Sequence, residues 1–531
     1  MKEFNTTAVC IPIKHYMVDL SERVKEIKKL VDAGKYFTIN RARQYGKTTT
    51  LNALRKALAA EYVMVGLDFQ GLGNASFETE ETFCRGFVRL ILDKLEYHQI
   101  LVPSKIAEQM NQFVAAGKED SKLVDLMRLM RRWCAESERP VVLMIDEVDS
   151  TTNNQVLLDF LAQLRDGYIC RETDDIPAFW SVILASVTDI KHLKGTIFPD
   201  EPHKVNSPWN IAADFNVDMS LSEDGISGML EEYEADHHTG MDTAAIAKSI
   251  REYTNGYPFL VSRICQLIDT VMVPDRFETL AQAWTLYGVD EAVKMLLSEN
   301  NTLFQSITKN LDNYPELKAA IRSILMEGTR LTFSGQQDSI VQMQMYGLIR
   351  NDRGAVRIDN RIFETMLYNL FLSDEELKNS VFYKEGNLAK NIFVKDGVLN
   401  VELILRRFID TFGEVYGLLE ERFKEKDGRE LFLLYLKPII NGTGSYYIEA
   451  QTRDQKRTDV IIDYLGRQYI IELKIWRGER DNEEGAKQIM EYLDYFDLTK
   501  GYMLSFNFNN NKVTGIHTVQ IGGKILHEGV V

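Results

Sequence analysis

The sequence has little cysteine, proline and histidine. Its 531 residues include five cysteines, 11 prolines and eight histidines, and no two cysteines form a CxxC pair. Scattered thiols without histidines at ligand spacing argue against a disulfide framework and a structural zinc site. No apolar run approaches the roughly 20 residues of a membrane helix, and the first residues lack an apolar stretch of signal-peptide length. These absences predict a reduced, cytoplasmic compartment and no membrane contact.

The chain is acidic, but its charge is unevenly distributed. The formal net charge is −16, from 62 Lys and Arg against 78 Asp and Glu. Residues 381–531 carry 21 basic and 23 acidic groups, so most of the excess lies in residues 1–380. Because an acidic surface repels nucleic-acid phosphates, we expect any such contact in the nearly neutral C-terminal part. A hydrophobic content of 45% excludes disorder, and the length predicts about three or four domains.

Short apolar runs alternate with helical patterns over residues 1–205. Four runs stand out, at residues 36–40, 62–68, 141–145 and 180–185. Uninterrupted apolar runs of this length are typical of strands that are buried on both faces of a parallel sheet. We therefore predict an α/β domain of the P-loop type over residues 1–205.

The pattern becomes largely helical over residues 206–372. It breaks at Asn-Gly-Tyr-Pro (255–258), and a helical stretch before Gly347 is followed by GLIR, the turn NDRG and AVRI. A helix followed by a two-stranded hairpin is typical of a winged-helix module, but an internal packing domain has the same pattern. Polar residues 373–390 predict a linker. Residues 391–531 have an α+β pattern: helices, two short strands, another helix and a final strand.

A phosphate-loop pattern occupies residues 41–48 (RARQYGKT), between a predicted strand and a helical run. A loop placed there directs backbone N–H groups and the positive end of a helix at an anion. We expect Lys47 to contact the β and γ phosphates of ATP, and Thr48 to place its hydroxyl on Mg²⁺. Gly46 lets the backbone approach closely. An ordinary strand-to-helix turn is the alternative.

Two further residues, Arg43 and Thr49, complete the predicted loop contacts with the nucleotide. The full pattern begins with glycine, whereas Arg41 stands at that position here. This departure predicts a wider loop or weaker nucleotide binding.

An acidic pair supports the nucleotide interpretation. Asp146 and Glu147 follow the run 141–145 directly, at the end of a strand where α/β sheets bind ligands. We expect Asp146 to hold Mg²⁺ and Glu147 to polarise the water that attacks the γ phosphate, although acidic residues here can also be helix caps. After the next strand, Ser186 or Thr188 is placed to sense the γ phosphate, or forms a turn.

These segments resemble a known family. YFTINRARQYGKTTTL, VVLMIDEVDS, SPWNI and NGYPFLV are similar to AAA-like ATPases related to the signal-transduction class of P-loop proteins. The resemblance spans about residues 1–370, and members often have an arginine-rich start in place of the first glycine. It implies a loop that binds ATP despite Arg41, followed by a helical lid and a winged helix.

A second chemical pattern lies in residues 457–476 (RTDVIIDYLGRQYIIELKIW). Two β-rich runs flank Leu465-Gly466, and a two-residue turn there places Asp459 directly opposite Glu472. Lys474 falls on the same face, while Val460, Ile462, Ile471, Leu473 and Ile475 fall together on the other, which we expect to be the core. Two carboxylates about 5 Å apart can share a divalent ion, and a nearby lysine can orient water.

Phosphodiester cleavage with Mg²⁺ or Mn²⁺ fits this set, although a solvated hairpin with charges on its wet face has the same pattern. A helix beginning near Glu430 precedes the hairpin, and helical residues 483–496 follow it. Basic side chains gather around it, as a phosphate substrate needs: Arg453, Lys456, Arg457, Arg467, Lys474, Arg477 and Arg480.

Residues 390–531 resemble the PD-(D/E)xK nuclease superfamily. Asp459 matches its first acidic motif, and Glu472-Leu473-Lys474 matches E-x-K. The resemblance also implies roles for three helical residues, Glu430, Gln488 and Tyr492. The sequence departs from the pattern because Arg457-Thr458, and not a proline, precede Asp459. A restriction-endonuclease-like α+β domain is therefore expected at this end.

The leading hypothesis is an ATP-controlled nuclease that acts on DNA or RNA, with a homo-oligomer left open. The alternative is a nucleotide-dependent switch or scaffold whose nuclease-like domain binds nucleic acid or a partner without cleavage. A small-molecule kinase that uses the phosphate loop leaves the last 140 or so residues unexplained.

Overall fold

The protein divides into two units in the computed structural model. By contacts within the chain, unit 1 comprises Met1–His238, Gly256–Gln266 and Gln336–Leu348, and unit 2 comprises Thr239–Asn255, Leu267–Gly335 and Ile349–Val531. The structure describes all residues except 1, 116–120, 152–154, 188–208, 328, 330, 374–380, 389–391, 396–397, 417–424, 441–443, 448–459, 465–466, 477–485, 488, 492, 495–497 and 510–511.

Unit 1 contains a four-stranded parallel sheet with the order β1-β4-β3-β2. Its strands lie within one residue of the runs predicted from the sequence. They are β1 (Tyr36–Asn40), β2 (Val63–Asp68), β3 (Val141–Asp146) and β4 (Ser181–Ser186). The predicted parallel α/β sheet is therefore confirmed.

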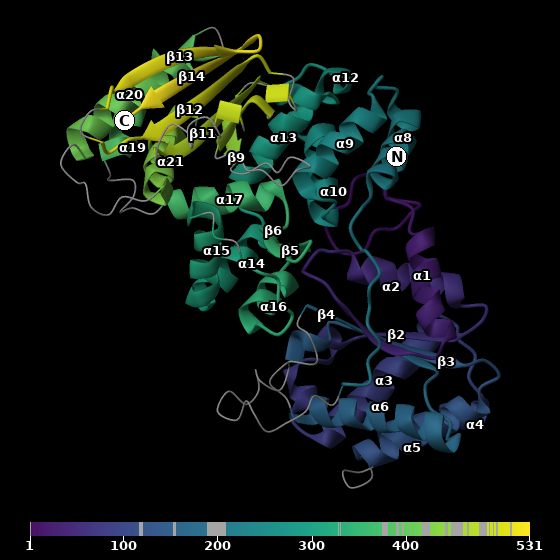
Figure 1. Ribbon diagram of the computed structural model, residues 1–531. Helices are drawn as coiled ribbons and strands as arrows, with labels where there is room; N and C mark the ends of the chain where they lie inside the picture. The colour runs from purple at the N-terminus through teal and green to yellow at the C-terminus, as the bar shows by residue number, and fades with distance from the viewer. Residues whose placement is uncertain are drawn as a thin grey trace. The chain divides into compact units, whose positions relative to one another are not determined.

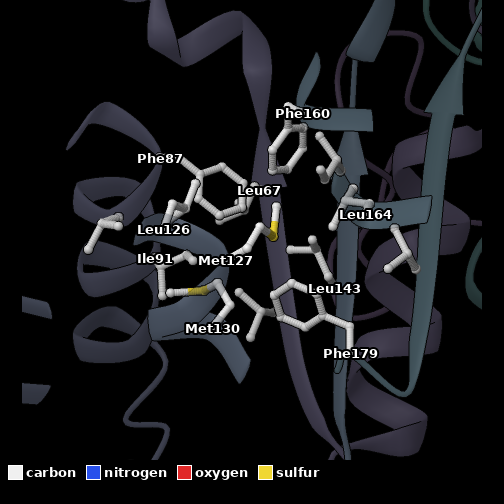
Figure 2. Packing of buried hydrophobic residues seen from close by; sticks show 14 of the residues in the cluster. Leu67, Phe87, Ile91, Leu126, Met127, Met130, Leu143, Phe160, Leu164 and Phe179 are labelled. Carbon is white, nitrogen blue, oxygen red and sulfur yellow. The ribbon is translucent and has the colours of Figure 1, made fainter. Parts of the chain in front are cut away.

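Helices cover both faces of this sheet. Phe37, Met64 and Val142 point to one face and pack against α1 (Ser21–Asp32) and α2 (Lys47–Leu58). The neighbouring residues along the strands point to the opposite face, where they pack with α3 (Glu80–Tyr97), α4 (Ser104–Ala115), α5 (Leu123–Glu136) and α6 (Gln155–Asp174). Figure 2 shows part of this second cluster, with Leu67 and Leu143 of the sheet among aromatic and methionine side chains. Burial on both faces explains why the strands lack alternation.

The helical region after the sheet begins with α8 (Glu223–His237) and α9 (Thr243–Thr254). The predicted break is confirmed, because α9 ends at Thr254 and α10 (Pro258–Thr270) begins after it. Asn255 and Gly256 both have positive φ, and a Cβ on Gly256 would lie 2.2 Å from the carbonyl oxygen of Leu221. The break therefore requires glycine. The helices that follow are α11 (Met272–Asp275), α12 (Leu280–Ala283), α13 (Leu286–Ser298), α14 (Thr302–Asn313) and α15 (Pro315–Glu327).

A helix and a hairpin end this region. In unit 1, α16 (Asp338–Met345) precedes Gly347; in unit 2, β5 (Ile349–Asp352) and β6 (Ala355–Ile358) pair antiparallel and lead into α17 (Arg361–Leu372). The predicted helix-then-hairpin order is confirmed. Its interpretation as a winged helix stays a prediction.

Part of the segment predicted as a linker is folded. Val381–Leu388 form helix α19, in which Phe382 is buried and Gly386 lies against the backbone of α21 (Glu425–Ile440). The polar composition of 373–390 concealed these packing positions. A short antiparallel pair, β7 (Val394–Lys395) with β8 (Val398–Leu399), and helix α20 (Val401–Tyr416) follow α19.

The C-terminal part of unit 2 is built on a six-stranded mixed sheet, drawn in yellow and green in Figure 1. Its order is β13-β14-β12-β11-β10-β9. The strands are β9 (Gly444–Tyr447), β10 (Val460–Tyr464), β11 (Arg467–Ile475), β12 (Lys500–Phe506), β13 (Gly515–Ile521) and β14 (Lys524–Val530). Strands β11, β12 and β14 are parallel to one another, while the outer pairs are antiparallel.

The predicted hairpin register is confirmed over its described pairs, from Val460 opposite Ile471 to Tyr464 opposite Arg467. The face expected to be the core is buried, with Val460, Ile462, Ile471 and Leu473 all fully buried. The opposite face, which the solvated-hairpin alternative leaves wet, is buried as well at Ile461 and Ile470, which pack with Ile489 and Leu493 of the helical residues between 486 and 494. The sheet is covered on both sides because this helical stretch presents its own apolar face. Within the described ranges, no helix combines the length and apolar composition needed to cross a membrane.

Candidate functional site

The phosphate loop connects β1 to α2. Gly46 is the N-cap of α2 with a φ of +78°, and a Cβ added to it would meet no atom within 4 Å. Glycine is therefore required by the left-handed backbone, and the space beside it stays open for a ligand. The first turn of α2 contains no acidic residue. No acidic side chain of this turn therefore neutralises the positive end of the helix, which faces the open space beside Gly46.

Lys47, the first residue of α2, is 5% exposed. Its Nζ donates hydrogen bonds to the carbonyl oxygens of Arg41 (3.0 Å) and Ala42 (3.1 Å). Burial lowers the pKa of the Lys47 ammonium, and the nearby carboxylates of Glu147 and Asp149 oppose that shift. The loop thus holds a cation inside its own curve, where a bound polyphosphate would lie.

Thr48 and Asp146 meet across the sheet edge. The Thr48 hydroxyl donates a 2.6 Å hydrogen bond to Oδ2 of Asp146, the last residue of β3. Burial raises the pKa of the Asp146 carboxyl, and the bond from Thr48 opposes the shift. Burial likewise raises the pKa of the Glu147 carboxyl, and the positive charge of Lys47 opposes this shift. Glu147 has a φ of +51°, a backbone region that non-glycine residues rarely adopt.

The donor set at this position suits Mg²⁺. A hydroxyl and a buried carboxylate are hard oxygen ligands, and Mg²⁺ typically takes one or two protein carboxylates and completes its shell with water and phosphate oxygens. Thr48 and Asp146 would hold the ion, which would neutralise phosphate charge. Glu147 follows Asp146 directly in the chain, so its carboxylate would lie close enough to the ion to act on a bound water.

Arg41, at the position of the missing glycine, has a structural role. Its guanidinium donates hydrogen bonds to the carbonyl oxygens of Asn40 and Val217, each at 2.8 Å, and lies 5.4 Å from the ring centre of Phe215. These contacts fasten the segment 215–217 beside β1. The arginine therefore holds the base of the loop, a role that the sequence did not predict.

Two segments that return to unit 1 from later in the chain contact the phosphate loop. The buried hydroxyl of Tyr257 donates a 2.5 Å hydrogen bond to the carbonyl oxygen of Arg43, and its ring packs edge-on against Tyr45. Gly347 has a φ of +71°, and a Cβ there would lie 2.7 Å from the Cβ of Ala42. The sequence indicated a chain break at Tyr257 but gave no sign of contact with the loop.

Three other predicted residues have defined positions. The side chain of Arg43 is exposed, close enough to Lys47 and Glu147 to affect the pKa of both. The Thr49 hydroxyl accepts a 3.2 Å hydrogen bond from the backbone N–H of Cys10. The Ser186 hydroxyl donates to Oδ1 of Asn40 at 2.8 Å and so ties β4 to the end of β1. Thr188 lies outside the described residues.

Comparison with known families matches residues 14–373 to the AAA-like domain. The chain belongs to this family. Among solved structures, a Walker-type ATPase of Pyrococcus abyssi is similar at 12% identity and a TM-score of 0.47, over 69% of this chain and 99% of that one. The ORC2 protein of Aeropyrum pernix in its ADP form has 10% identity and a TM-score of 0.36, over 70% and 98%. RuvB of Thermotoga maritima has 12% identity and a TM-score of 0.33, over 64% of this chain and 92% of that one. No curated protein matches the chain.

The phosphate loop, the acidic strand end and the parallel sheet all lie within the AAA-like domain. This match agrees with the predicted family and with an ATPase-type P-loop. It ends at residue 373 and says nothing of the C-terminal sheet.

Beyond the AAA-like domain, the structure places two of the predicted nuclease residues on one sheet face. Glu472 and Lys474 alternate with apolar residues in β11, and Glu472 is 4% exposed. A carboxylate removed from water needs compensating partners or a bound cation. This burial excludes the solvated-hairpin interpretation for Glu472. Asp459, Gln488 and Tyr492 lie outside the described residues.

Glu430 is positioned by helix α21. Its Oε1 accepts a 2.9 Å hydrogen bond from Nη2 of Arg322 in α15, in a partly exposed ion pair. The structure therefore joins this predicted nuclease residue to the helical region that precedes the sheet.

Sequence reasoning missed two polar residues on the face of Glu472. Ser505 lies beside Lys474 in the parallel register of β11 and β12, and its hydroxyl donates a 2.8 Å hydrogen bond to Oε1 of Glu528 in β14. Both side chains are buried. An acidic residue inside the last apolar run, KILHEGVV, was the available signal. Among the residues that the structure describes, no three His, Cys, Asp or Glu side chains are grouped as metal ligands.

Proposed function

We propose that the protein binds Mg²⁺ and ATP in the AAA-like domain, hydrolyses the nucleotide, and uses its state to control a metal-dependent nuclease in the C-terminal domain. The ATP part rests on one observation above all, the 2.6 Å contact of Thr48 with Asp146 next to a lysine held inside the loop. This arrangement supplies a magnesium ligand pair, a phosphate-binding cation and a helix N-terminus at one sheet edge.

Glu147 is the proposed general base for ATP hydrolysis. It follows the metal-binding aspartate directly, and burial raises the pKa of its carboxyl, which strengthens it as a proton acceptor for water. Phosphate release by the wild type and by Glu147→Gln tests this role. We expect the variant to bind ATP as the wild type does but to release phosphate at least about 100-fold more slowly.

The nuclease part rests on the burial of Glu472 on the same face as Lys474. A buried carboxylate beside an amine suits a divalent ion and a phosphate, because the ion compensates the carboxylate charge and the amine stabilises the charge of the reaction. The sequence adds Asp459 as the second predicted metal ligand. DNA or RNA is the proposed substrate, and Mg²⁺ or Mn²⁺ the proposed metal.

The test uses the full chain with labelled single- and double-stranded DNA and RNA, with and without ATP and with Mg²⁺ or Mn²⁺. We expect metal-dependent cleavage that disappears in Glu472→Gln, whose side chain has nearly the same shape. ATP binding, which belongs to the AAA-like domain, should stay intact in this variant, and a thermal melt like that of the wild type separates failure of the nuclease from failure of folding. Equal cleavage by wild type and variant rejects the nuclease.

The alternative function, a nucleotide-dependent switch or scaffold, is favoured by the ion pair of Glu430 with Arg322, which commits one predicted nuclease residue to a structural contact. In that case the wild type binds nucleic acid or a protein partner in an ATP-dependent way and cleaves nothing under any metal condition.

A further inference from the structure

Strand β13 forms one edge of the C-terminal sheet. It is the terminal strand in the sheet order and pairs antiparallel with β14, from Gly515 opposite Val530 to Ile521 opposite Lys524. Figure 1 shows it as the outermost strand beside β14. All residues from His517 to Ile521 are exposed, whereas the neighbouring β14 is largely buried. Side chains on both faces of the strand are therefore exposed from His517 to Ile521, although helix α20 contacts the strand.

The hydrogen bonds of β14 show which groups of β13 point outward. The N–H groups of Ile525 and Val531 donate to carbonyl oxygens on the β12 side, at 2.9 Å each. Alternation along a strand then directs the N–H groups of the even-numbered residues of β14 toward β13.

The even-numbered residues of β14 pair with odd-numbered residues of β13, such as His517 opposite Glu528. Consequently the backbone N–H and C=O groups of Ile516, Thr518 and Gln520 point away from the sheet. These groups form a row that can accept another strand.

The sequence of β13 contains none of the residues that usually protect a sheet edge from pairing with another strand. Its sequence, GIHTVQI, contains no Asp, Glu, Lys, Arg or Pro. Proteins protect long sheet edges with charges, prolines or bulges, because an unprotected edge pairs with other strands. Ile516, Thr518, Val519 and Ile521 are β-branched and favour extended structure. Val519 is 43% and Ile521 37% exposed.

We propose that β13 pairs antiparallel with β13 of a second copy of this chain, across a two-fold axis at Thr518. The outward groups are arranged symmetrically about that residue, so Thr518 faces Thr518, Ile516 faces Gln520, and every outward donor meets an acceptor. No charge on the strand opposes a second copy at this edge. The whole chain has a net charge of −16, but the strand itself is neutral, so two copies meet there without like charges opposite each other.

Charge-swap variants of the full chain test this pairing. Thr518→Lys and Thr518→Glu each place two like charges directly opposite at the axis, which destabilises a strand pair. We expect sedimentation to show a dimer for the wild type, a monomer for each variant alone, and a dimer again for an equimolar mixture. Thr514→Lys, which adds the same charge at an exposed position before the strand, is the matched control and is expected to stay dimeric.

The mixture also controls for local damage. Thr518 contacts Nδ1 of His527 at 3.1 Å, and both variants lose that contact, so its loss cannot explain a dimer that reappears only on mixing. Thermal melts of each variant check that the chain is folded. A monomeric wild type at concentrations up to about 100 μM overturns the proposal, because a dimer weaker than this falls outside the affinity range of stable interfaces. Dimers that persist in both single variants also overturn it.

Discussion

The hydroxyl of Thr48 donates a 2.6 Å hydrogen bond to the carboxylate of Asp146, although 98 residues separate them in the chain. Thr48 lies in the first turn of α2, which follows β1, and Asp146 is the last residue of β3. The sheet order places β4 between β1 and β3. The first helical turn after β1 and the carboxyl end of β3 therefore meet at one sheet edge. This pair fixes where a metal ion and a triphosphate would lie.

Replacement of Asp146 by Asn should change how stability depends on pH. Burial raises the pKa of the Asp146 carboxyl in the folded chain above its ordinary value of 3.8, so the folded state binds a proton more tightly than the unfolded state does. Stability is consequently lost as the pH rises through the folded pKa, and asparagine has no such loss. We expect the Tm of Asp146→Asn, relative to the wild type, to be higher at about pH 8 than at about pH 4. Calorimetry without nucleotide checks this, and a difference that does not vary with pH contradicts it.

The same Asp146→Asn variant should bind Mg²⁺ and ATP more weakly. Loss of the negative charge should reduce metal affinity by at least about 10- to 100-fold, the range seen when only the residues that support metal ligands are removed. Titration of ATP at a fixed Mg²⁺ concentration measures this effect. Unchanged affinity means that the ion is held elsewhere.

Restoring the glycine of the full phosphate-loop pattern should harm the protein. Arg41→Gly removes the hydrogen bond to Val217 and the contact with Phe215, and hydrogen bonds from charged groups contribute about 1.5–3 kcal/mol. We expect a loss of free energy of unfolding in that range and no tighter ATP binding. Arg41→Lys, which keeps the charge but not the two-carbonyl geometry, should be intermediate. A variant as stable as the wild type, with stronger ATP binding, shows that Arg41 only obstructs the loop.

Two glycines with positive φ allow backbone strain to be separated from steric contact. Gly347→Ala and Gly354→Ala both force alanine into the left-handed region, which costs about 1–2 kcal/mol. A Cβ at Gly354 meets open space, whereas one at Gly347 lies 2.7 Å from Ala42 of the phosphate loop. We therefore expect Gly347→Ala to lose more stability in urea unfolding and, of the two, to be the one that weakens ATP binding. Equal effects of both substitutions on ATP binding are inconsistent with contact between Gly347 and the loop.

The sequence predicted those features that depend on local pattern. The strands of unit 1 were found within a residue because burial on both faces produces continuous apolar runs, as in VVLMI before Asp146. The register of β10 and β11 followed from the two residues between them. In each case the neighbours in the chain determine the structure.

Features that depend on distant partners were not predicted. The direction of the Arg41 side chain is set by Phe215 and Val217, and the hydroxyl of Tyr257 reaches a carbonyl 214 residues earlier. Polar residues 373–390 concealed helix α19 because its packing depends on the backbone of α21. A single final strand was predicted after the last helix, where the structure has β12, β13 and β14. Gly522-Gly523 between two β-rich runs was an available turn signal.

Equilibrium binding of ATP by the wild type and Lys47→Ala is the most direct test of the central claim that the phosphate loop holds a nucleotide. Lys56→Ala, an exposed lysine of the same helix, is the matched control. In the presence of Mg²⁺ we expect the wild type and the control to bind alike, and Lys47→Ala at least about tenfold more weakly, a difference of roughly 1.4 kcal/mol. Equal affinity of all three proteins for ATP contradicts the account.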